Sequence, residues 1–258
     1  MYYEIHGSGE PLVFISGMGG STSSMLLRVP AFSPEYQVVI FDNRGSGQSD
    51  APDIPYTMEM MTGDLAGLLD VVGIEAAHIS GESFGGGIAQ CFALRYPKRV
   101  ISLILASTNC GIAHSIPSHE LIKFLTDMPK MTPEERARAQ IRLFVTPEFA
   151  DKNPDIMQRM LERMMERSPS PQGSRRQAAM VATGGTYERL PEIKAPTLII
   201  AGDADRAVPA ENSRILASRI PHAELVILKN AGHLLTEAED EKNRIMLDFL
   251  RRHSTKKA

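Results

Sequence analysis

Short apolar runs alternate with longer amphipathic segments along the first 110 residues of the chain. Residues 100–106 are almost entirely apolar, which is typical of a strand buried on both faces of a parallel sheet. Residues 57–72 instead repeat their apolar positions every three or four residues as far as Gly73, which predicts a helix. The alternation of these two patterns predicts an α/β fold, with a mostly parallel sheet covered by helices on both faces.

The same patterns locate the individual elements. A turn-forming cluster, Gly7-Ser8-Gly9-Glu10, separates the first two expected strands and predicts a hairpin between them. The last residues, 251–258, are expected to form a frayed tail. We expect strands at residues 2–6, 11–16, 37–41, 77–80, 100–106, 197–201 and 224–228, and helices at 57–72, 84–96, 134–144, 155–167, 211–219 and 240–250.

The rhythm changes between residues 111 and 190, where strand-like runs almost disappear and charged residues cluster. We expect a helical insertion there, between the two parts of an α/β core formed by residues 1–110 and 191–258. Residues 168–173, Ser-Pro-Ser-Pro-Gln-Gly, predict a loop within it.

The helix expected at residues 155–167 carries Met157, Met160, Leu161 and Met164 at helical spacing, so one of its faces is apolar. Core packing against the main domain is the favoured interpretation. The alternative is the roof of a substrate pocket, where flexible thioether side chains adapt to varied ligands. One face is able to serve both purposes, so the three methionines are candidate pocket residues.

Composition and charge narrow the range of functions. The 28 basic and 31 acidic residues leave a net charge of −3, so the chain lacks the positive field that attracts nucleic acid. Neither an apolar run of about 18 residues nor an export signal is visible, and we expect a soluble protein without a membrane partner. Two cysteines are too few for a disulfide framework, which favours a reducing, cytoplasmic setting.

The pentad Gly81-Glu82-Ser83-Phe84-Gly85 has the pattern G-x-S-x-G and falls between an expected strand and an expected helix. A serine on such a sharp turn is held in a strained conformation with its hydroxyl exposed, and glycines on either side avoid collisions. This placement predicts a nucleophilic serine at Ser83; an incidental serine in a packing turn is the alternative.

A nucleophilic serine needs a base that is held in turn by a carboxylate, and in this arrangement the chain order is Ser, acid, His. The C-terminal third of the chain supplies both groups. Asp203 and Asp205 follow the strand expected at residues 197–201, and His233 follows the last expected strand. All three residues are therefore expected at the same edge of the sheet as Ser83.

These segments together resemble the α/β-hydrolase superfamily, and in particular its branch of small esterases, enol-lactonases and C–C bond hydrolases. The resemblance covers essentially the whole chain and is weak only in the insertion. It is carried by residues 15–20 (Ile-Ser-Gly-Met-Gly-Gly), residues 41–49 (Phe-Asp-Asn-Arg-Gly-Ser-Gly-Gln-Ser), the Ser83 turn and the loops of Asp205 and His233. We expect a sheet of about seven to eight strands; the N-terminus lacks the family's first antiparallel edge strand, which favours seven.

The resemblance implies a role for each residue of the site. Ser83 is the nucleophile, His233 the base, and Asp205 the carboxylate that orients the imidazole, because the family pattern G-x-x-D-x-x-V-P places the acid there and leaves Asp203 as a rival. The family's other acid position, after residue 106, holds no carboxylate. The backbone N–H groups of Met18 and Phe84 form the oxyanion hole. Ser16 stands where the family usually has His.

We therefore expect a serine hydrolase of the carboxylesterase or lactonase type, acting on small to medium apolar substrates without a cofactor or a metal. A small-molecule substrate is the expected partner, and a homodimer is considered as an oligomeric state. C–C bond hydrolysis, cofactor-free perhydrolysis and a slow-turnover ligand sensor remain open as alternatives, because fold and triad do not separate them.

Other residues are expected to be structural. The Gly45-Ser46-Gly47 sequence lacks the third glycine of a dinucleotide loop, since Asp50 stands at that position. Arg44 beside it is expected to form a scaffold ion pair. His6, His78, His222 and His253 are expected in structural roles, while His114 and His119 at the start of the insertion are either exposed or capping residues or contact a substrate.

Overall fold

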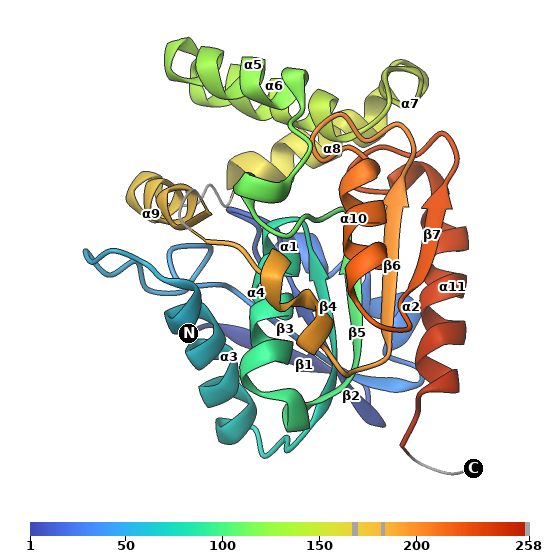
Figure 1. Cartoon of the computed structure of the whole chain (residues 1–258). Coiled ribbons are helices and arrows are strands. Elements are labelled where there is room, and N and C mark those ends of the chain that lie inside the picture. The colour runs from blue at the N-terminus through green and yellow to red at the C-terminus, as the bar shows by residue number, and fades with distance from the viewer. Residues whose placement is uncertain (167–169, 182–183, 256–258) are drawn as a thin grey trace.

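A computed structural model describes residues 1–166, 170–181 and 184–255 of the chain. Within these residues one sheet of seven strands has the order β1-β3-β2-β4-β5-β6-β7, and every pairing except β1 with β3 is parallel (Figure 1). The mostly parallel sheet predicted from the sequence is confirmed. The strands are β1 (Tyr3–His6), β2 (Glu10–Ile15), β3 (Tyr36–Phe41), β4 (Ala77–Glu82), β5 (Val100–Ala106), β6 (Thr197–Gly202) and β7 (Glu224–Leu228).

The predicted hairpin between the first two strands is wrong, because β3 lies between them and pairs with both. Gly7 and Gly9 have positive φ angles and lie against the chain that leads into β3. A Cβ atom on Gly7 would stand 2.2 Å from the carbonyl oxygen of Ser33, and one on Gly9 would stand 2.2 Å from that of Glu35. The glycines thus allow close packing of two segments about 25 residues apart, which a local pattern does not distinguish from a tight hairpin turn.

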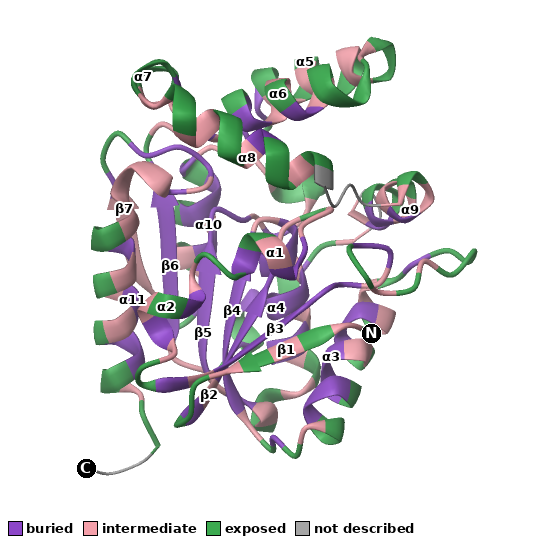
Figure 2. Cartoon of the chain, turned by 180° about the vertical axis from the view of Figure 1, so that it is seen from behind, coloured by how far each residue is buried: buried purple, intermediate pink, exposed green. Residues whose placement is uncertain are grey.

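Helices cover both faces of the sheet, and the alternation of side chains along each strand divides the core into two layers. Val13 and Val39 belong to the layer under α3 (Met58–Val71), α4 (Phe84–Arg95) and α10 (Glu211–Arg219), whereas their neighbours Leu12 and Val38 belong to the opposite layer. That opposite layer is covered by α1 (Thr22–Met25), α2 (Val29–Phe32) and α11 (Glu239–Arg252). Figure 2 shows strands β2 to β6 buried between these helices, whereas the edge strand β1 is exposed or half-buried.

The described residues between β5 and β6 are largely helical, and Figure 1 shows α5 to α8 above the carboxyl ends of the strands. The side chains of Ser118, Thr132 and Thr146 each accept a hydrogen bond from a backbone N–H in the first turn of the helix that follows, which explains where these helices begin. The helices are α5 (His119–Asp127), α6 (Pro133–Phe144), α7 (Pro147–Lys152), α8 (Pro154–Glu166) and α9 (Pro171–Val181).

Two segments expected to be irregular are ordered over part of their length. Helix α9 begins at Pro171, inside the loop expected at residues 168–173, because proline fits the first turn of a helix as well as it fits a loop. Residues 167–169 lie outside the described residues. The expected frayed tail is also wrong as far as residue 255, since α11 continues to Arg252 and its end is held by the ion pairs of Arg251 with Glu35 and of Arg252 with Glu224. Residues 256–258 of that tail lie outside the described residues.

Several short elements complete the chain. They are the 3₁₀ helices η1 (Pro97–Arg99), η2 (Ile112–His114), η3 (Met128–Lys130), η4 (Tyr187–Glu192) and η5 (Thr236–Ala238). Among residues 1–166, 170–181 and 184–255, none of the helices combines the length and the apolar character needed to cross a membrane.

Candidate active site

Ser83 occupies a strained turn between β4 and α4. Its φ angle is +52°, a region that residues other than glycine rarely adopt, and its N–H donates to the carbonyl oxygen of Ala106 at 2.9 Å. A Cβ atom on Gly81 would lie 2.3 Å from the oxygen of Gly85, and one on Gly85 would lie 2.2 Å from the oxygen of Ile15. Neighbouring backbone comes so close to both flanking glycines that neither position has room for a side chain. The turn holds the Ser83 hydroxyl at the sheet edge.

The structure brings Ser83, His233 and Asp205 into one line of hydrogen bonds. The distance from His233 Nε2 to Ser83 Oγ is 3.0 Å, and that from His233 Nδ1 to Asp205 Oδ2 is 2.8 Å. Asp205 follows β6 and His233 follows β7, so parallel strands deliver the three side chains to the same edge of the sheet. This is the geometry in which an imidazole accepts a proton from a serine while a carboxylate holds its other nitrogen.

The geometry also distinguishes the two rival carboxylates. Asp205 is buried, and its second oxygen, Oδ1, accepts hydrogen bonds from the N–H groups of Ala207 and Val208, each at 2.8 Å. These bonds orient the carboxylate so that its other oxygen, Oδ2, faces the imidazole. Asp203 instead accepts from the N–H of Asn230 at 2.7 Å, and His233 hydrogen-bonds to Asp205.

The environment of His233 favours its protonated form. Burial of the imidazole, which is 2% exposed, acts to lower its pKa, but the attraction and hydrogen bond of Asp205 outweigh burial, and the Glu82 carboxylate adds to them. The net effect is a pKa above the ordinary histidine value. The ring of Phe144 packs against the imidazole with 4.7 Å between centroids, so the imidazole is shielded from water on that side.

Glu82, directly before Ser83, belongs to a buried group of charges that the sequence did not single out. Its carboxylate forms an ion pair with Arg28. Lys242, 2% exposed, forms an ion pair with Glu239 at 3.0 Å, and burial lowers its pKa. Both the Arg28 and Glu82 charges act on Lys242, so these groups form one electrostatic cluster beneath the serine turn.

The expected oxyanion-hole residues lie on either side of Ser83. Phe84 is the first residue of α4, where backbone N–H groups and the helix dipole favour negative charge. Gly17 lies beside the serine: a Cβ atom on it would stand 3.5 Å from Ser83 Cβ. Met18 is the next residue in the chain. The two N–H groups that the resemblance names therefore belong to segments adjacent to the serine.

Gln177 of α9 is a residue of the site that sequence reasoning missed. This fully buried side chain accepts a hydrogen bond from the Gly19 N–H at 3.1 Å and donates to the Arg44 oxygen at 2.9 Å and to Ser46 Oγ at 3.0 Å. It fastens the insertion to the loop that carries Met18. A lone glutamine in a segment where the sequence predicted no particular element gave no signal of this contact.

Other predicted residues fall into structural roles. The Arg44 guanidinium donates two hydrogen bonds of 2.6 Å to Asp64, which confirms the expected scaffold ion pair. His78 is buried against Ser102 Oγ at 2.8 Å, and His114 stacks on the ring of Tyr187 with 4.0 Å between centroids. In place of the family's usual His, Ser16 lies 3.4 Å from the side-chain nitrogen of Asn43.

The candidate pocket methionines pack within the insertion. Partly buried Met157, Met160 and Met164 contact a small apolar cluster formed by Ala137, Ile141 and Leu161. This cluster joins α8 to α6. Their role toward a substrate stays a prediction.

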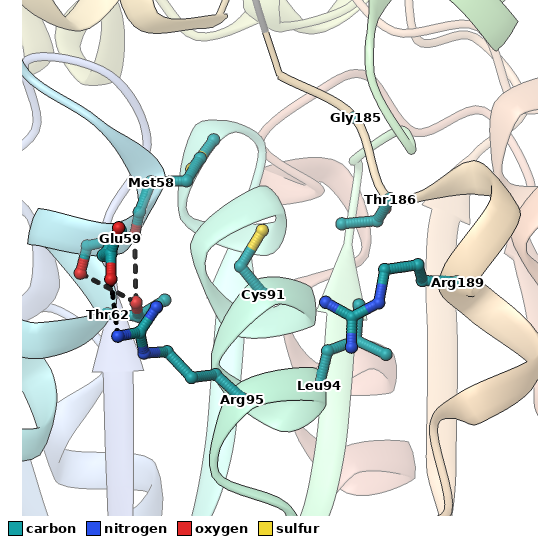
Figure 3. A pocket seen from close by; sticks show the side chains of 9 residues that line it. All are labelled: Met58, Glu59, Thr62, Cys91, Leu94, Arg95, Gly185, Thr186 and Arg189. Atoms are coloured by element: carbon teal, nitrogen blue, oxygen red, sulfur yellow. Dashed lines mark hydrogen bonds and ion pairs between the residues drawn. The ribbon is translucent and has the colours of Figure 1, made fainter.

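A separate pocket of about 320 Å³ lies beside α4, and none of the residues that line it belongs to the Ser83 line of hydrogen bonds. Burial raises the pKa of the Cys91 thiol in its wall to about 11, so this cysteine stays protonated near neutral pH. No group of three or more His, Cys, Asp or Glu side chains that could hold a metal occurs among the described residues. Figure 3 shows the pocket's lining: Met58, Glu59, Thr62, Cys91, Leu94, Arg95, Gly185, Thr186 and Arg189.

A match to the alpha/beta hydrolase fold family covers residues 10–240. The chain belongs to this family. The α/β hydrolase is 29% identical over 254 residues to a protein of Azorhizobium caulinodans named "Putative carbamate hydrolase RutD", covering 96% of this chain and 94% of the relative.

Two further relatives extend the range of reactions found in this family. A 2-hydroxy-6-oxononadienedioate/2-hydroxy-6-oxononatrienedioate hydrolase of Burkholderia vietnamiensis is 33% identical over 265 residues, covering 98% of this chain and 91% of the relative. The solved structure of the enol-lactonase from Burkholderia xenovorans LB400 superposes with a TM-score of 0.84 at 27% identity, covering 97% of this chain and 96% of that one. The α/β hydrolase is thus similar over its whole length to hydrolases that differ in the bond they cleave.

Proposed function

We propose that this α/β hydrolase is a serine hydrolase that cleaves carboxylic esters or lactones of small to medium apolar substrates. The observation that carries the proposal is the unbroken line of hydrogen bonds from Ser83 through His233 to Asp205, with distances of 3.0 and 2.8 Å. An activated serine, a base and an orienting carboxylate are the parts that acyl transfer through a covalent intermediate requires.

The reaction begins when Ser83 Oγ attacks the substrate carbonyl carbon while its proton passes to His233 Nε2. Asp205 stabilises the resulting imidazolium, and the N–H groups of Met18 and Phe84 hold the negative charge on the former carbonyl oxygen. Collapse of this intermediate breaks the C–O bond, and His233 gives its proton to the departing alkoxide. Water then attacks the acyl-enzyme by the same route, which releases the acid and regenerates Ser83.

The proposed preference for apolar substrates rests on the surroundings of the serine. Met18 is 39% exposed and follows Gly17, which lies beside Ser83. The described residues between 111 and 190 form a helical cap in this proposal, since α5 to α8 lie above the carboxyl ends of the strands. In this proposal Met157, Met160 and Met164 adapt the underside of the cap to the acyl or ring part of the substrate.

C–C bond hydrolysis is the second candidate. It is favoured by the 33% identity to a relative whose name describes a hydrolase of 2-hydroxy-6-oxononadienedioate. The same serine, base and oxyanion donors serve both reactions, and the substrate decides between them.

A substrate panel tests the proposal. The wild type and Ser83→Ala are compared on 4-nitrophenyl esters from acetate to octanoate, on lactones of matching size and on a 2-hydroxy-6-oxo dienoate. We expect wild-type turnover of esters or lactones that is abolished in Ser83→Ala, with the preferred chain length reporting the size of the pocket. Turnover of the dienoate alone would overturn the ester or lactone assignment in favour of C–C hydrolysis.

A further inference from the structure

The junction between α6 and α7, residues 144–146, packs directly on the loop that carries His233. The Leu234 N–H donates to the Phe144 carbonyl oxygen at 3.1 Å, and the Phe144 ring lies against the imidazole. A Cβ atom on Gly232 would stand 2.8 Å from that same oxygen and 2.9 Å from Val145 Cα. Backbone therefore touches backbone immediately before and after the imidazole.

Glu237 ties these two segments together through its side chain. One carboxylate oxygen accepts the Thr146 N–H at 2.6 Å, and the other accepts the Gly232 N–H at 3.1 Å. Glu237 lies in η5 and is half-buried, so both of its oxygens serve the protein where water competes weakly. The carboxylate bridges the insertion to the residue that precedes His233.

The loop of Asp205 reaches the same junction. The Arg206 guanidinium donates to the carbonyl oxygen of Val145 at 3.1 Å and also to that of Arg142. Both catalytic loops are thus anchored on residues 142–146, one through Arg206 and one through Glu237. A shift of this junction relative to the core changes the position of the imidazole and of its carboxylate partner.

We propose that Glu237 is a positioning residue that holds His233 in line between Asp205 and Ser83 by clamping Gly232 to Thr146. This inference rests on the proposed serine hydrolase function. A single imidazole must maintain two hydrogen bonds at once, 2.8 and 3.0 Å long, and the Gly232 N–H directly before it is held by the Glu237 carboxylate. Because Glu237 binds both the insertion and the His233 loop, a displacement of the insertion on substrate contact also displaces the imidazole.

Glu237→Gln is the first test, because an amide accepts from only one of the two N–H groups with its single oxygen. We expect kcat on a 4-nitrophenyl ester to fall about 10-fold while KM stays within about 2-fold, since small displacements of a catalytic group act on the chemical step. The acidic midpoint of the kcat/KM profile is expected at lower pH, because a looser imidazole loses part of its interaction with Asp205. Glu241→Gln, an exposed residue of α11, is the matched control and is expected to leave all three quantities unchanged.

The partner N–H provides an independent test. Thr146→Pro removes the N–H that Glu237 accepts, at a φ angle of −69° that proline adopts without strain. Thr146→Ala keeps this N–H and removes only the hydroxyl that caps α7, so it controls for loss of the cap. We expect Thr146→Pro to reproduce the kcat loss of Glu237→Gln, Thr146→Ala to retain kcat, and the double variant to be no slower than either single one.

The outcomes separate this inference from the proposed function. A wild type that hydrolyses none of the substrates and whose Ser83 reacts with no phosphonate overturns the proposed function itself. An active wild type with an inactive Ser83→Ala, together with a folded Glu237→Gln of unchanged kcat and pH midpoint, overturns only the clamp. If circular dichroism shows that Glu237→Gln does not fold, the Thr146 pair decides, and equal kcat values for its proline and alanine variants overturn the clamp.

Discussion

At the scale of single residues, the site depends on which of two nearby carboxylates faces the imidazole. Asp203 and Asp205 both follow β6, and spacing alone leaves both available. The N–H groups of Ala207 and Val208 bind one oxygen of Asp205 and leave the other for His233. Asp203 is used instead to hold Asn230 in the loop before His233.

This difference predicts contrasting effects of two matched substitutions. Asp205→Asn is expected to lower kcat by about 10⁴-fold, because the amide no longer stabilises the correct imidazole tautomer or the imidazolium. Asp203→Asn keeps an oxygen for Asn230 and is expected to change kcat by less than about 3-fold. Steady-state kinetics on one ester compares them; equal losses in the two variants would show that the acid is assigned wrongly.

The raised pKa of His233 predicts the pH dependence of the reaction. The base must be neutral to accept the Ser83 proton, so kcat/KM falls as the pH drops through the pKa of the free enzyme. Because the folded environment raises that pKa above the ordinary value of 6.5, the acidic midpoint is expected above pH 6.5. A midpoint of the wild-type kcat/KM profile below pH 6.5 would contradict this electrostatic account.

At the scale of elements, the serine turn depends on glycines that differ sharply in their surroundings. Gly85 lies against the backbone oxygens of Ile15 and Ser16, where a Cβ atom would be 2.2 and 2.6 Å away. Gly87, two residues further along α4, has only the flexible end of Met58 nearby at 3.4 Å. One glycine is needed for close packing of α4 on β2, and the other is only a poor helix former.

Alanine substitutions of these two glycines are expected to have opposite effects on the free energy of unfolding. Gly85→Ala forces α4 away from β2 and is expected to cost about 3 kcal/mol. Gly87→Ala is expected to stabilise the chain by about 0.5 kcal/mol, because alanine favours the helix and its methyl group has room. Urea unfolding measures both, and a Gly85→Ala variant as stable as the wild type would refute the tight packing of the turn.

The elements that sequence patterns predicted correctly are those whose pattern is decided locally. Strands β5 and β7 and helix α10 have the predicted bounds, because each is a short apolar or amphipathic run between clear breakers. The order of β1, β3 and β2 was missed, since it depends on Gly7 packing against Ser33. The Ser83 turn was predictable from its motif, whereas Gln177 and Glu237 act through contacts with backbone distant in sequence.

At the scale of the whole molecule, the start of β2 holds the segment that follows α11. Glu10, at the start of β2, accepts hydrogen bonds from the N–H and hydroxyl of Thr255 and from the hydroxyl of Ser254. Burial acts to raise the pKa of Glu10, but these hydrogen bonds together with His78 lower it to about 2. The segment expected to fray is thus held by a buried carboxylate, which no local pattern reveals.

Glu10→Gln is expected to lower the free energy of unfolding by about 2 kcal/mol near neutral pH, the usual cost of weakening hydrogen bonds to a charged group. A carboxyl whose pKa is lowered on folding contributes stability above its unfolded value near 4.5, and that contribution is lost as the pH falls through about 2. The difference between wild type and variant, measured by urea unfolding, is therefore expected to shrink from pH 5 toward pH 2. A constant difference over this range would contradict the account.

Peptide mapping after reaction with a 4-nitrophenyl alkylphosphonate decides whether Ser83 is the nucleophile of a serine hydrolase. This reagent phosphonylates an activated serine and releases one equivalent of 4-nitrophenol. We expect one adduct per chain, on the peptide that contains Ser83, and none in His233→Gln under the same conditions. An adduct on another residue, or an unmodified Ser83 in folded wild-type enzyme, would contradict the account.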